Sequence, residues 1–507
     1  MANAVILQTF EWEMGAEGNF YKNLARMAPS LARRGFDAVW LPPASKATTV
    51  NYVGYGIYDL YDLGEFDQKG QVRTKYGTKD ELLDAIKALQ EQGIKVYMDV
   101  VLNHKAGADY TETFRAQPVQ VDNRNQAAGE ERDIDGWTGF NFPGRQDKYS
   151  DLHWSFNHFT GVDFDQKTGE KGIFRILGDN KNWAEGVSHE YGNFDYLMFA
   201  DIDHRHPDVQ KDLYHWADWL VDQTSCDGFR FDAMKHIDSD FVKDYTQYLT
   251  DKYGDKLYLF GEFWSPGLDK MAGFLDATAF NLDLFDVDLH FRFYQAGMDP
   301  NFDLRQVFDQ SLVQSFPMNA VTFVDNHDTQ PGQSLESFVD RSFKERAYAL
   351  ILLRKDGYPC VFAGDYFGIH GGPAPQEGMA DELERLLELR ANYAYGEERD
   401  FFVDPHFIAW ARLGDEEFPS LLATVISTAG DGAVEVDFGP DHAGKIFRDY
   451  TGHREEIITL DENGKASFPV SGQSLSCWVS PDARDRGTLD KDYDQFLENL
   501  GRPKLEI

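Results

Sequence analysis

Short apolar runs of strand length recur along this chain, and helical stripes separate several of them. The runs cover residues 5–10, 38–41, 94–102, 229–231, 257–261, 321–324 and 360–362. Most of them end on polar or acidic residues. Strands that alternate with helices indicate parallel βα units, and about eight such units predict an α/β fold of the TIM (β/α)8 barrel type. A doubly wound parallel sheet is the alternative, because periodicity by itself does not separate the two.

Two helices carry start signals that support this alternation. A capping-box pattern runs from Thr78 to Glu81 before an apolar stripe, and Gly93 supplies the stop. Pro207 suits the first position of another helix. The apolar stripe of that helix consists of Val209, Leu213, Trp216 and Leu220.

The alternation breaks down in two places, which predicts further domains. The chain has 507 residues, more than the roughly 250–300 at which one hydrophobic core stops growing. We expect the barrel at 1–102 and 205–398, with an inserted B domain at 103–204 after the third strand. Short alternating runs predict a C-terminal antiparallel β-sandwich at 399–480. The charged tail, 481–507, carries one weak helical stripe.

The charge balance limits the partners of this protein. The chain has 49 basic and 86 acidic side chains, a formal net charge of -37. Such a charge repels phosphate backbones and anionic lipids, so neither nucleic acid nor a membrane is expected as a partner. A highly solvated surface explains the acidity, and adaptation to salt is the alternative.

Targeting and redox signals are also missing from the sequence. Cys226, Cys360 and Cys477 have neither metal-ligand spacing nor a disulfide-framework pattern, which predicts buried thiols. The N-terminus has no basic region before its short apolar stretch, and no segment approaches the ~20 apolar residues of a membrane span. We therefore expect a cytoplasmic protein, with secretion as the alternative if a signal peptide has been lost from this sequence. A monomer is also expected.

Carboxylates follow the apolar runs at the points where functional side chains of a barrel are found. The segments concerned are 99–104, 228–236, 261–264 and 323–328. Each acid has an ordinary explanation: Asp232 can pair with Arg230, and Glu262 can cap a helix. Together, however, Asp232, Glu262 and Asp328 match glycosidic bond cleavage, whose oxocarbenium-like transition state needs a carboxylate and a protonated acid.

Neighbouring residues divide the roles among these three carboxylates. Asp232 lies next to Arg230, which favours its ionised form and predicts the nucleophile. Glu262 precedes the apolar pair Phe263-Trp264, so desolvation is expected to raise its pKa, as a general acid/base requires. Asp328 is predicted to hold sugar hydroxyls and to stabilise the transition state.

The four segments resemble, in order and separation, the four signature regions of the α-amylase family. Residues 54–66 and 193–203 are similar to liquefying-type bacterial α-amylases and their cytoplasmic relatives. The resemblance covers about residues 4–480 and implies a barrel, an inserted B domain and a C-terminal β-sandwich. It also implies endo-acting hydrolysis of α-1,4-glucosidic bonds in starch, glycogen or maltodextrins. The implied chemistry is a retaining double displacement through a covalent glycosyl-enzyme intermediate.

The same resemblance implies a set of substrate-binding residues around the carboxylates. They are Tyr55, His104, Arg230, Lys235, His236, Trp264 and His327. Tyr55 is expected to form an aromatic platform beside the two histidines of the cleavage subsite, His104 and His327. Lys235 and Trp264 are expected on the acceptor side, together with the imidazole of residue 236. Core packing is the alternative for the aromatic residues.

A calcium site is the cofactor that the resemblance implies. Its ligands are Asn103, Asp195, Asp201 and the backbone carbonyl of His236, which would join the inserted domain to the barrel. Hard oxygen ligands suit Ca²⁺ better than a transition metal. Solvated loop aspartates are the alternative for these acids.

Two departures from the family pattern lead to further expectations. Relatives with a linked second metal cluster have an Asp where this sequence has Ala184, although Asp163 and Asp203 are retained. Chloride-activated members place an Arg shortly after the fourth segment, whereas Gln330-Pro331-Gly332 follows it here. The sequence therefore leaves a second metal site undecided, and chloride dependence is not expected.

Overall fold

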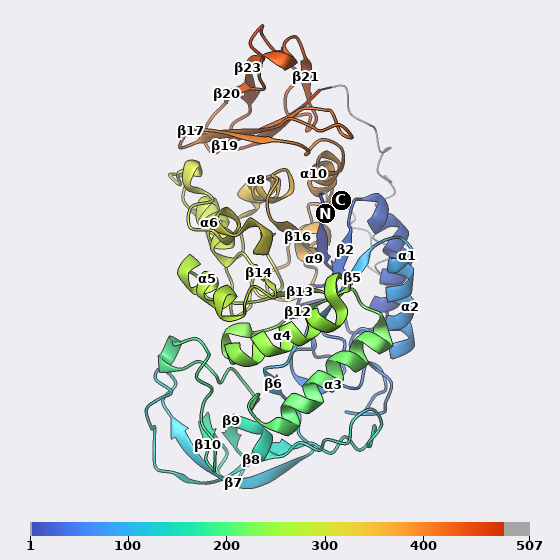
Figure 1. Ribbon diagram of the computed structural model, residues 1–507, viewed down its shortest axis with the longest axis vertical. Helices are drawn as coiled ribbons and strands as arrows, with labels where there is room; N and C mark the ends of the chain where they lie inside the picture. Colours follow the sequence, from blue (N-terminus) through green and yellow to red (C-terminus); the bar gives the residue numbers. More distant parts are fainter. Residues whose placement is uncertain (1–2, 481–507) are drawn as a thin grey trace.

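The computed structural model describes residues 3–480, and a closed barrel of eight parallel strands lies at its centre (Figure 1). In order around the barrel, the strands are β1 (Ile6–Gln8), β2 (Ala38–Trp40), β5 (Lys95–Val100), β12 (Gly228–Phe231), β13 (Tyr258–Gly261), β14 (Asp283–Phe285), β15 (Ala320–Phe323) and β16 (Tyr358–Phe362). Strand β16 pairs with β1 and closes the ring. The predicted TIM barrel is confirmed, and the doubly wound alternative is wrong. The predicted tail, 481–507, lies outside the described residues.

Strand β14 (Asp283–Phe285) is the barrel strand that the apolar runs did not predict. Only Leu284 and Phe285 in it are buried and apolar, and acidic residues flank them on both sides. Parallel pairing places Asp283 opposite Phe260 of β13 and Phe285 opposite Val321 of β15. Backbone pairing with two neighbouring strands therefore defines β14, because its apolar run is too short to predict a strand from the sequence.

Helices follow most barrel strands and surround the barrel. They are α1 (Phe20–Arg33), α2 (Lys79–Gln90), α3 (Pro207–Thr224), α4 (Ser239–Tyr253), α5 (Leu268–Ala277), α6 (Val287–Met298), α7 (Leu312–Ser315), α8 (Arg341–Leu352), α9 (Ala363–Phe367) and α10 (Ala380–Asn392). The predicted capping box of α2 is present, because Thr78 and Glu81 bond each other's backbone N–H. Pro207 is the first residue of α3, as predicted. In residues 3–480, no helix is both long and apolar enough to cross a membrane.

An antiparallel sheet of six strands is inserted between β5 and α3. Its order is β6 (His104–Lys105), β11 (Ala200–Ile202), β9 (Phe159–Asp165), β10 (Glu170–Ile176), β7 (Tyr110–Val119) and β8 (Arg132–Gly139). Strand β6 directly follows the third barrel strand. Its pairing with β11 places Asp201 opposite His104, so the insertion returns to the end of the barrel from which it left.

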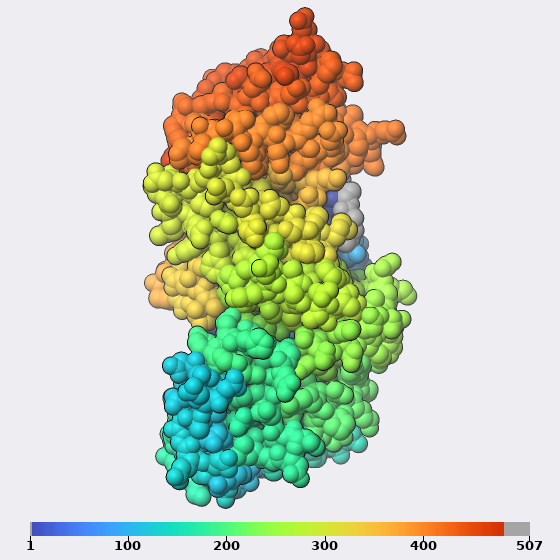
Figure 2. All heavy atoms as spheres, turned by 60° about the vertical axis from the view of Figure 1, so that its left-hand side comes forward, coloured from blue at the N-terminus to red at the C-terminus, as the bar shows by residue number. Residues whose placement is uncertain are grey.

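The C-terminal region is a β-sandwich of a six-stranded and a two-stranded sheet. The larger sheet contains β17 (Glu398–Asp404), β18 (Phe407–Arg412), β19 (Leu422–Ser427), β24 (Leu475–Val479), β21 (Ile446–Asp449) and β22 (Ile457–Thr459). The smaller sheet pairs β20 (Gly432–Asp437) with β23 (Lys465–Val470). Both sheets share one apolar core, to which Val434, Phe468 and Trp478 contribute. Figures 1 and 2 show the sandwich, the barrel and the inserted sheet following one another along the long axis.

All three cysteines are buried and free, as their spacing predicted. Cys360 lies in β16 and Cys477 in β24, whereas Cys226 precedes β12. Burial raises the pKa of the Cys226 and Cys360 thiols to about 12, so both remain protonated thiols near neutral pH.

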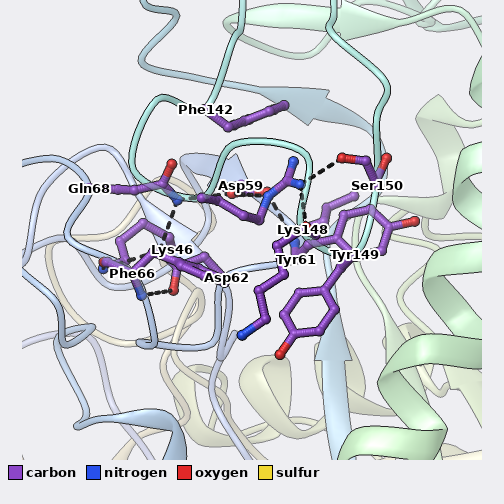
Figure 3. Close-up of polar contacts among 12 residues, drawn as sticks. Lys46, Asp59, Tyr61, Asp62, Phe66, Gln68, Phe142, Lys148, Tyr149 and Ser150 are labelled. Atoms are coloured by element: carbon purple, nitrogen blue, oxygen red, sulfur yellow. Dashed lines mark hydrogen bonds and ion pairs between the residues drawn. The ribbon is translucent and has the colours of Figure 1, made fainter.

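A buried network of charged side chains joins the loop after β2 to the inserted region. Arg145 Nε donates to Asp59 Oδ2 at 2.8 Å, and each side chain is only 1% exposed. Gln68 Nε2 lies 2.9 Å from carboxylate oxygens of both Asp59 and Asp62, and Lys46 pairs with Asp62 at 3.3 Å (Figure 3). Since these charges are removed from water, each depends on its partners for compensation.

Replacing Arg145 with Met will leave the Asp59 carboxylate buried without its cation. We expect the apparent unfolding free energy to fall by about 3–5 kcal/mol, the usual cost of breaking a buried ion pair. Urea unfolding followed by tryptophan fluorescence measures this loss. Arg132→Met is the matched control, because Arg132 pairs with Glu170 at the surface and should lose at most ~1 kcal/mol. Equal losses in the two variants would contradict a special role for the buried pair.

Candidate active site

One fully buried guanidinium, that of Arg230, gathers three carboxylates at the ends of neighbouring barrel strands. Its Nη1 donates to Asp232 Oδ1 at 2.7 Å and to Asp99 Oδ1 at 3.1 Å, and its Nη2 donates to Glu262. The strand register explains part of this geometry, because Arg230 of β12 lies directly opposite Asp99 of β5. Asp232 and Glu262 are the residues that immediately follow β12 and β13. The predicted pairing of Arg230 with Asp232 is present, and the same cation also binds two further acids.

The local environment keeps Glu262 partly protonated near neutral pH. Burial raises the pKa of the Glu262 carboxyl to about 7, the negative charges of Asp232 and Asp99 add to this rise, and Arg230 opposes it. The residue is 8% exposed, so it still reaches the solvent side of the barrel. The predicted rise in the Glu262 pKa from desolvation is therefore present, with neighbouring carboxylates as a second cause.

Asp328 lies close enough to the same cluster for the charges of that cluster to shift its pKa. It follows β15, and its backbone N–H donates to Asn326 Oδ1 at 2.8 Å. Burial raises the pKa of Asp328 well above its ordinary value, and the charges of Glu262 and Asp232 raise it further. The barrel thus brings the three predicted carboxylates together from three strands.

Aromatic and imidazole rings line the cluster on the β1 side. The Tyr55 ring is parallel to His327, with centroids 5.0 Å apart, and Trp12 is parallel to both at 6.0 Å. The Tyr55 hydroxyl donates to Asp99 Oδ2 at 2.9 Å, and His104 Nε2 bonds the Tyr55 carbonyl at 2.8 Å. The structure therefore brings Tyr55, His104 and His327 together beside the carboxylates.

The residues predicted on the acceptor side occupy two different environments. Lys235 pairs with Glu190 of the inserted region at 3.1 Å, and His236 Nδ1 donates to the Phe194 carbonyl at 2.7 Å. Trp264 is only 7% exposed and packs against aromatic side chains of α6 and β15. Core packing, the alternative for Trp264, accounts for most of its surface.

Several residues of the site carry no assigned role in the sequence interpretation. Asp99 bonds Arg230, and Trp40 Nε1 donates to Asp99 Oδ2 at 3.0 Å. Trp12 and Gln8 contact the rings of the site from the end of β1. The one usable signal was Asp99, a charge within an apolar run. The others resemble ordinary residues at the start of the chain.

Three of the residues predicted to bind calcium, Asn103, Asp195 and Asp201, interact with one another and are almost fully buried. Asn103 Nδ2 donates to Asp201 Oδ1 at 3.2 Å, whereas its Oδ1 is buried with no hydrogen-bond partner among the described residues. Burial raises the pKa of Asp195 to about 7. Burial and the charge of Asp195 raise that of Asp201 well above its ordinary value. Two buried acids that repel each other beside an unpaired amide oxygen fit a hard divalent cation such as Ca²⁺.

A second group of possible metal ligands, His158, His206 and Asp208, lies at the start of α3. Their ligand atoms lie within 4.8 Å of one another. Both imidazoles use Nδ1 to accept a backbone N–H, from Ser155 at 2.9 Å and from Asp208 at 3.2 Å. A neutral ring that accepts at Nδ1 carries its proton on Nε2 and has no second lone pair for a metal. This group therefore does not compete with the oxygen-rich site around Asn103.

The two acids retained from the second-cluster pattern have partners within the protein. Asp203 pairs with Lys181 at 3.1 Å and with Arg205 at 2.9 Å. Asp163 accepts the Phe199 backbone N–H at 3.2 Å. The side chains of Lys181 and Arg205 thus already neutralise Asp203, the acid that a second metal would otherwise share.

The architecture and the site together define a class of enzyme. A TIM barrel with clustered carboxylates at its strand ends has the arrangement of a barrel glycosidase. The sequence model of the family "Alpha amylase, catalytic domain" matches residues 29–402. The chain belongs to the α-amylase family of glycoside hydrolases.

Named relatives cover nearly the whole chain. It is 44% identical over 480 residues to an "Alpha-amylase" of Bacillus licheniformis, covering 94% of this chain and 93% of the relative. It is 41% identical over 491 residues to a "Cytoplasmic alpha-amylase" of Escherichia coli, covering 94% and 99%. A "Glucan 1,4-alpha-maltohexaosidase" of a Bacillus species is 44% identical over 483 residues, covering 94% and 92%. The solved structure of an Anoxybacillus α-amylase shares the fold, with a TM-score of 0.65 at 18% identity over 96% and 99% of the two chains.

Proposed function

We propose that this protein is an endo-acting α-amylase that hydrolyses internal α-1,4-glucosidic bonds of starch, glycogen or maltodextrins. The observation that best supports this proposal is the cluster of Asp232, Glu262 and Asp328 around one buried arginine at the barrel strand ends. The relatives named α-amylase, at 41–44% identity over 94% of the chain, support the substrate class.

The first chemical step needs a nucleophile and an acid in different protonation states. Asp232, bonded to Arg230, attacks the anomeric carbon and forms the covalent glycosyl-enzyme intermediate. Glu262, with a pKa near 7, gives its proton to the leaving oxygen at the same time. The glycosidic C–O bond breaks as the bond to the Asp232 carboxylate forms.

The second step reverses these roles with water. Glu262, now ionised, takes a proton from the water that attacks the anomeric carbon, and the Asp232 carboxylate leaves. Two inversions give net retention of the α configuration. Asp328 holds sugar hydroxyls and stabilises positive charge on the ring in both transition states, while the rings of Tyr55 and His327 form the wall of the cleavage subsite.

We also propose that a structural Ca²⁺ is held by Asn103, Asp195, Asp201 and the backbone carbonyl of His236. The buried, unpaired Oδ1 of Asn103 and the two buried acids support this assignment. The ion supplies charge compensation rather than chemistry at the glycosidic bond. Its ligands come from the strand ends of the barrel and from the inserted region, so binding would tie the two together.

A cytoplasmic monomer without nucleic-acid or membrane partners completes the proposal. The net charge of -37 supports the absence of polyanionic partners. The relative named "Cytoplasmic alpha-amylase" supports the location. Light scattering of the purified protein tests the monomer, and a mass of two chains would contradict it.

Asp232→Asn will abolish hydrolysis because an amide is a poor nucleophile. We expect kcat on amylose to fall by at least ~10³-fold, since no intermediate forms. The wild-type protein should release products in the α configuration, read by proton NMR during a short time course. Asp122→Asn, at an exposed position of the inserted region, is the control and should keep wild-type kcat. Products in the β configuration, or unchanged hydrolysis by Asp232→Asn, would contradict the mechanism.

The same time course separates α-amylase from other specificities of the family. Amylose should be cut at internal bonds, so its iodine stain should fade well before reducing ends accumulate. Pullulan should react poorly, because its α-1,6 bonds interrupt the α-1,4 chain. Faster cleavage of pullulan than of amylose would favour an α-1,6-specific enzyme. Product length is read from the same samples.

The alkaline side of the pH profile should report Glu262. Its pKa is raised to about 7, so the proton needed for the first step is present below this value and is lost above it. We expect kcat/KM, which reports the pKa of the free enzyme, to fall about 15-fold between pH 7 and pH 8.5. Asp99→Asn removes a negative charge that raises this pKa, so the alkaline limb should move to lower pH. A shift to higher pH, or a similar shift in Asp122→Asn, would contradict the assignment.

Removal of calcium should destabilise the protein through Asn103. Adding Ca²⁺ to chelator-treated protein should stabilise the fold, by about 2.7 kcal/mol at one hundred times its Kd. Thermal melting with and without Ca²⁺ measures this change independently of activity. Asn103→Ala should lose most of the calcium-dependent shift, whereas the exposed Asn157→Ala should retain it. A melting temperature that ignores a strong chelator would contradict the site.

A further inference from the structure

Gln8 is a buried polar residue at the end of β1 whose only described side-chain bond is to an active-site histidine. It is 1% exposed, and its Nε2 lies 2.9 Å from His327 Nδ1. Backbone pairing with Trp40 of β2 and Phe362 of β16 fixes its position in the barrel. Its Oε1 is buried and has no hydrogen-bond partner among residues 3–480. A glutamine in this position costs desolvation, so its one contact calls for an explanation.

The other ring nitrogen of His327 faces the carboxylate cluster. Nε2 lies 3.2 Å from Asp328 Oδ2, but the two are not aligned for a hydrogen bond, and no other described group is aligned with Nε2 either. The rings of Tyr55 and Phe10 pack at 5.0 Å and hold the imidazole in place. A proton on Nε2 would therefore have no acceptor among the described residues and would be available to a ligand that reaches Asp328.

The two contacts together select one protonation pattern. Burial and the charge of Arg230 lower the pKa of His327 well below its ordinary value, so the ring is neutral and has one N–H. When the Gln8 amide donates from Nε2, His327 Nδ1 must accept and the ring proton lies on Nε2. The reverse arrangement, with Gln8 Oε1 accepting from Nδ1, would point a bare Nε2 lone pair at Asp328. That arrangement requires a proton on Asp328, whereas the proposed role of Asp328 in stabilising positive charge on the sugar requires the ionised carboxylate.

We propose that Gln8 is a positioning residue that fixes His327 in the tautomer with its proton on Nε2, ready to donate to a sugar hydroxyl beside Asp328. This inference rests on the proposed function, since the sugar is the ligand that function supplies. It assigns a role to a residue that lies outside all four signature segments. A histidine in the wrong tautomer loses much of its catalytic value even in unchanged geometry.

Gln8→Glu tests the tautomer directly while keeping the shape of the side chain. A carboxylate only accepts, so it should draw the ring proton to Nδ1 and leave Nε2 as an acceptor. Ring ¹⁵N shifts in full-length protein labelled with [¹⁵N]histidine report the tautomer, and the signal missing in His327→Asn identifies the residue. We expect Nε2–H in the wild type and Nδ1–H in Gln8→Glu. A proton on Nδ1 in the wild type would overturn the proposal.

A kinetic cycle tests whether Gln8 acts through His327 even if Gln8→Glu fails to fold. Gln8→Met has similar length and no polar group, and its kcat on maltoheptaose should fall about 3- to 10-fold, the loss expected for one hydrogen bond between neutral groups. In the His327→Asn background the same substitution should have no further effect on kcat. An equal loss of kcat from Gln8→Met in the wild type and in His327→Asn would overturn the proposal. A glutamine with only a structural role would lower kcat equally in both proteins.

A second buried glutamine provides the matched control. Gln330 is fully buried and accepts the Trp12 backbone N–H at 3.0 Å, without a bond to the His327 ring. Any loss in Gln330→Met should therefore persist in the His327→Asn background. If the wild type hydrolyses neither amylose nor maltoheptaose, the proposed function fails, whereas the ¹⁵N measurement still decides the tautomer.

Discussion

The buried charge of Arg230 is the constraint on which the rest of the site depends. A guanidinium with no exposed surface is stable only if anions surround it, and the barrel supplies Asp99, Asp232 and Glu262 from three adjacent strands. One cation among three acids cannot neutralise all of them. Burial, and then this excess negative charge, raise the pKa of Glu262 and of the more distant Asp328. The raised pKa that a general acid requires at Glu262 therefore comes in part from the same cluster that holds this residue in place.

The inserted region is attached to the barrel by charges that are likewise removed from water. On one side, Arg145 and Asp59 form a buried ion pair, and the cation belongs to the protein. On the other side, Asp195 and Asp201 lie buried together with no comparable cationic side chain bonded to them among the described residues. The proposed calcium ion would take the place of such a side chain. A calcium ion can be removed, so the attachment at Asp195 and Asp201 would depend on the calcium concentration in solution. The attachment through Arg145 and Asp59 needs only the folded protein.

Local sequence signals predicted much of the fold because they act over a few residues. The capping box of Thr78 and Glu81 and the first-turn Pro207 are such signals, and both helices begin where they indicated. Strand β14 was missed because it has only two apolar residues, and its neighbours β13 and β15 define it. Asp232, Glu262 and Asp328 were predictable because each lies just after an apolar run, which is also a local signal. Asp99, which bonds the same Arg230 as Asp232 and Glu262, was visible only as a charge inside one run.

The sequence by itself determined the order of strands and helices, the three acids at strand ends and the identity of the family, because periodicity, capping and motifs are properties of neighbouring residues. Tertiary structure decided which groups share a charge or a proton. Closure of the barrel brings β1 beside β16, whose other neighbour is β15, and Gln8 meets His327 across 319 positions of the chain. It also lets one arginine bond three acids. Hydrogen bonds and pKa shifts depend on distance and burial in space, and neither follows from separation along the chain.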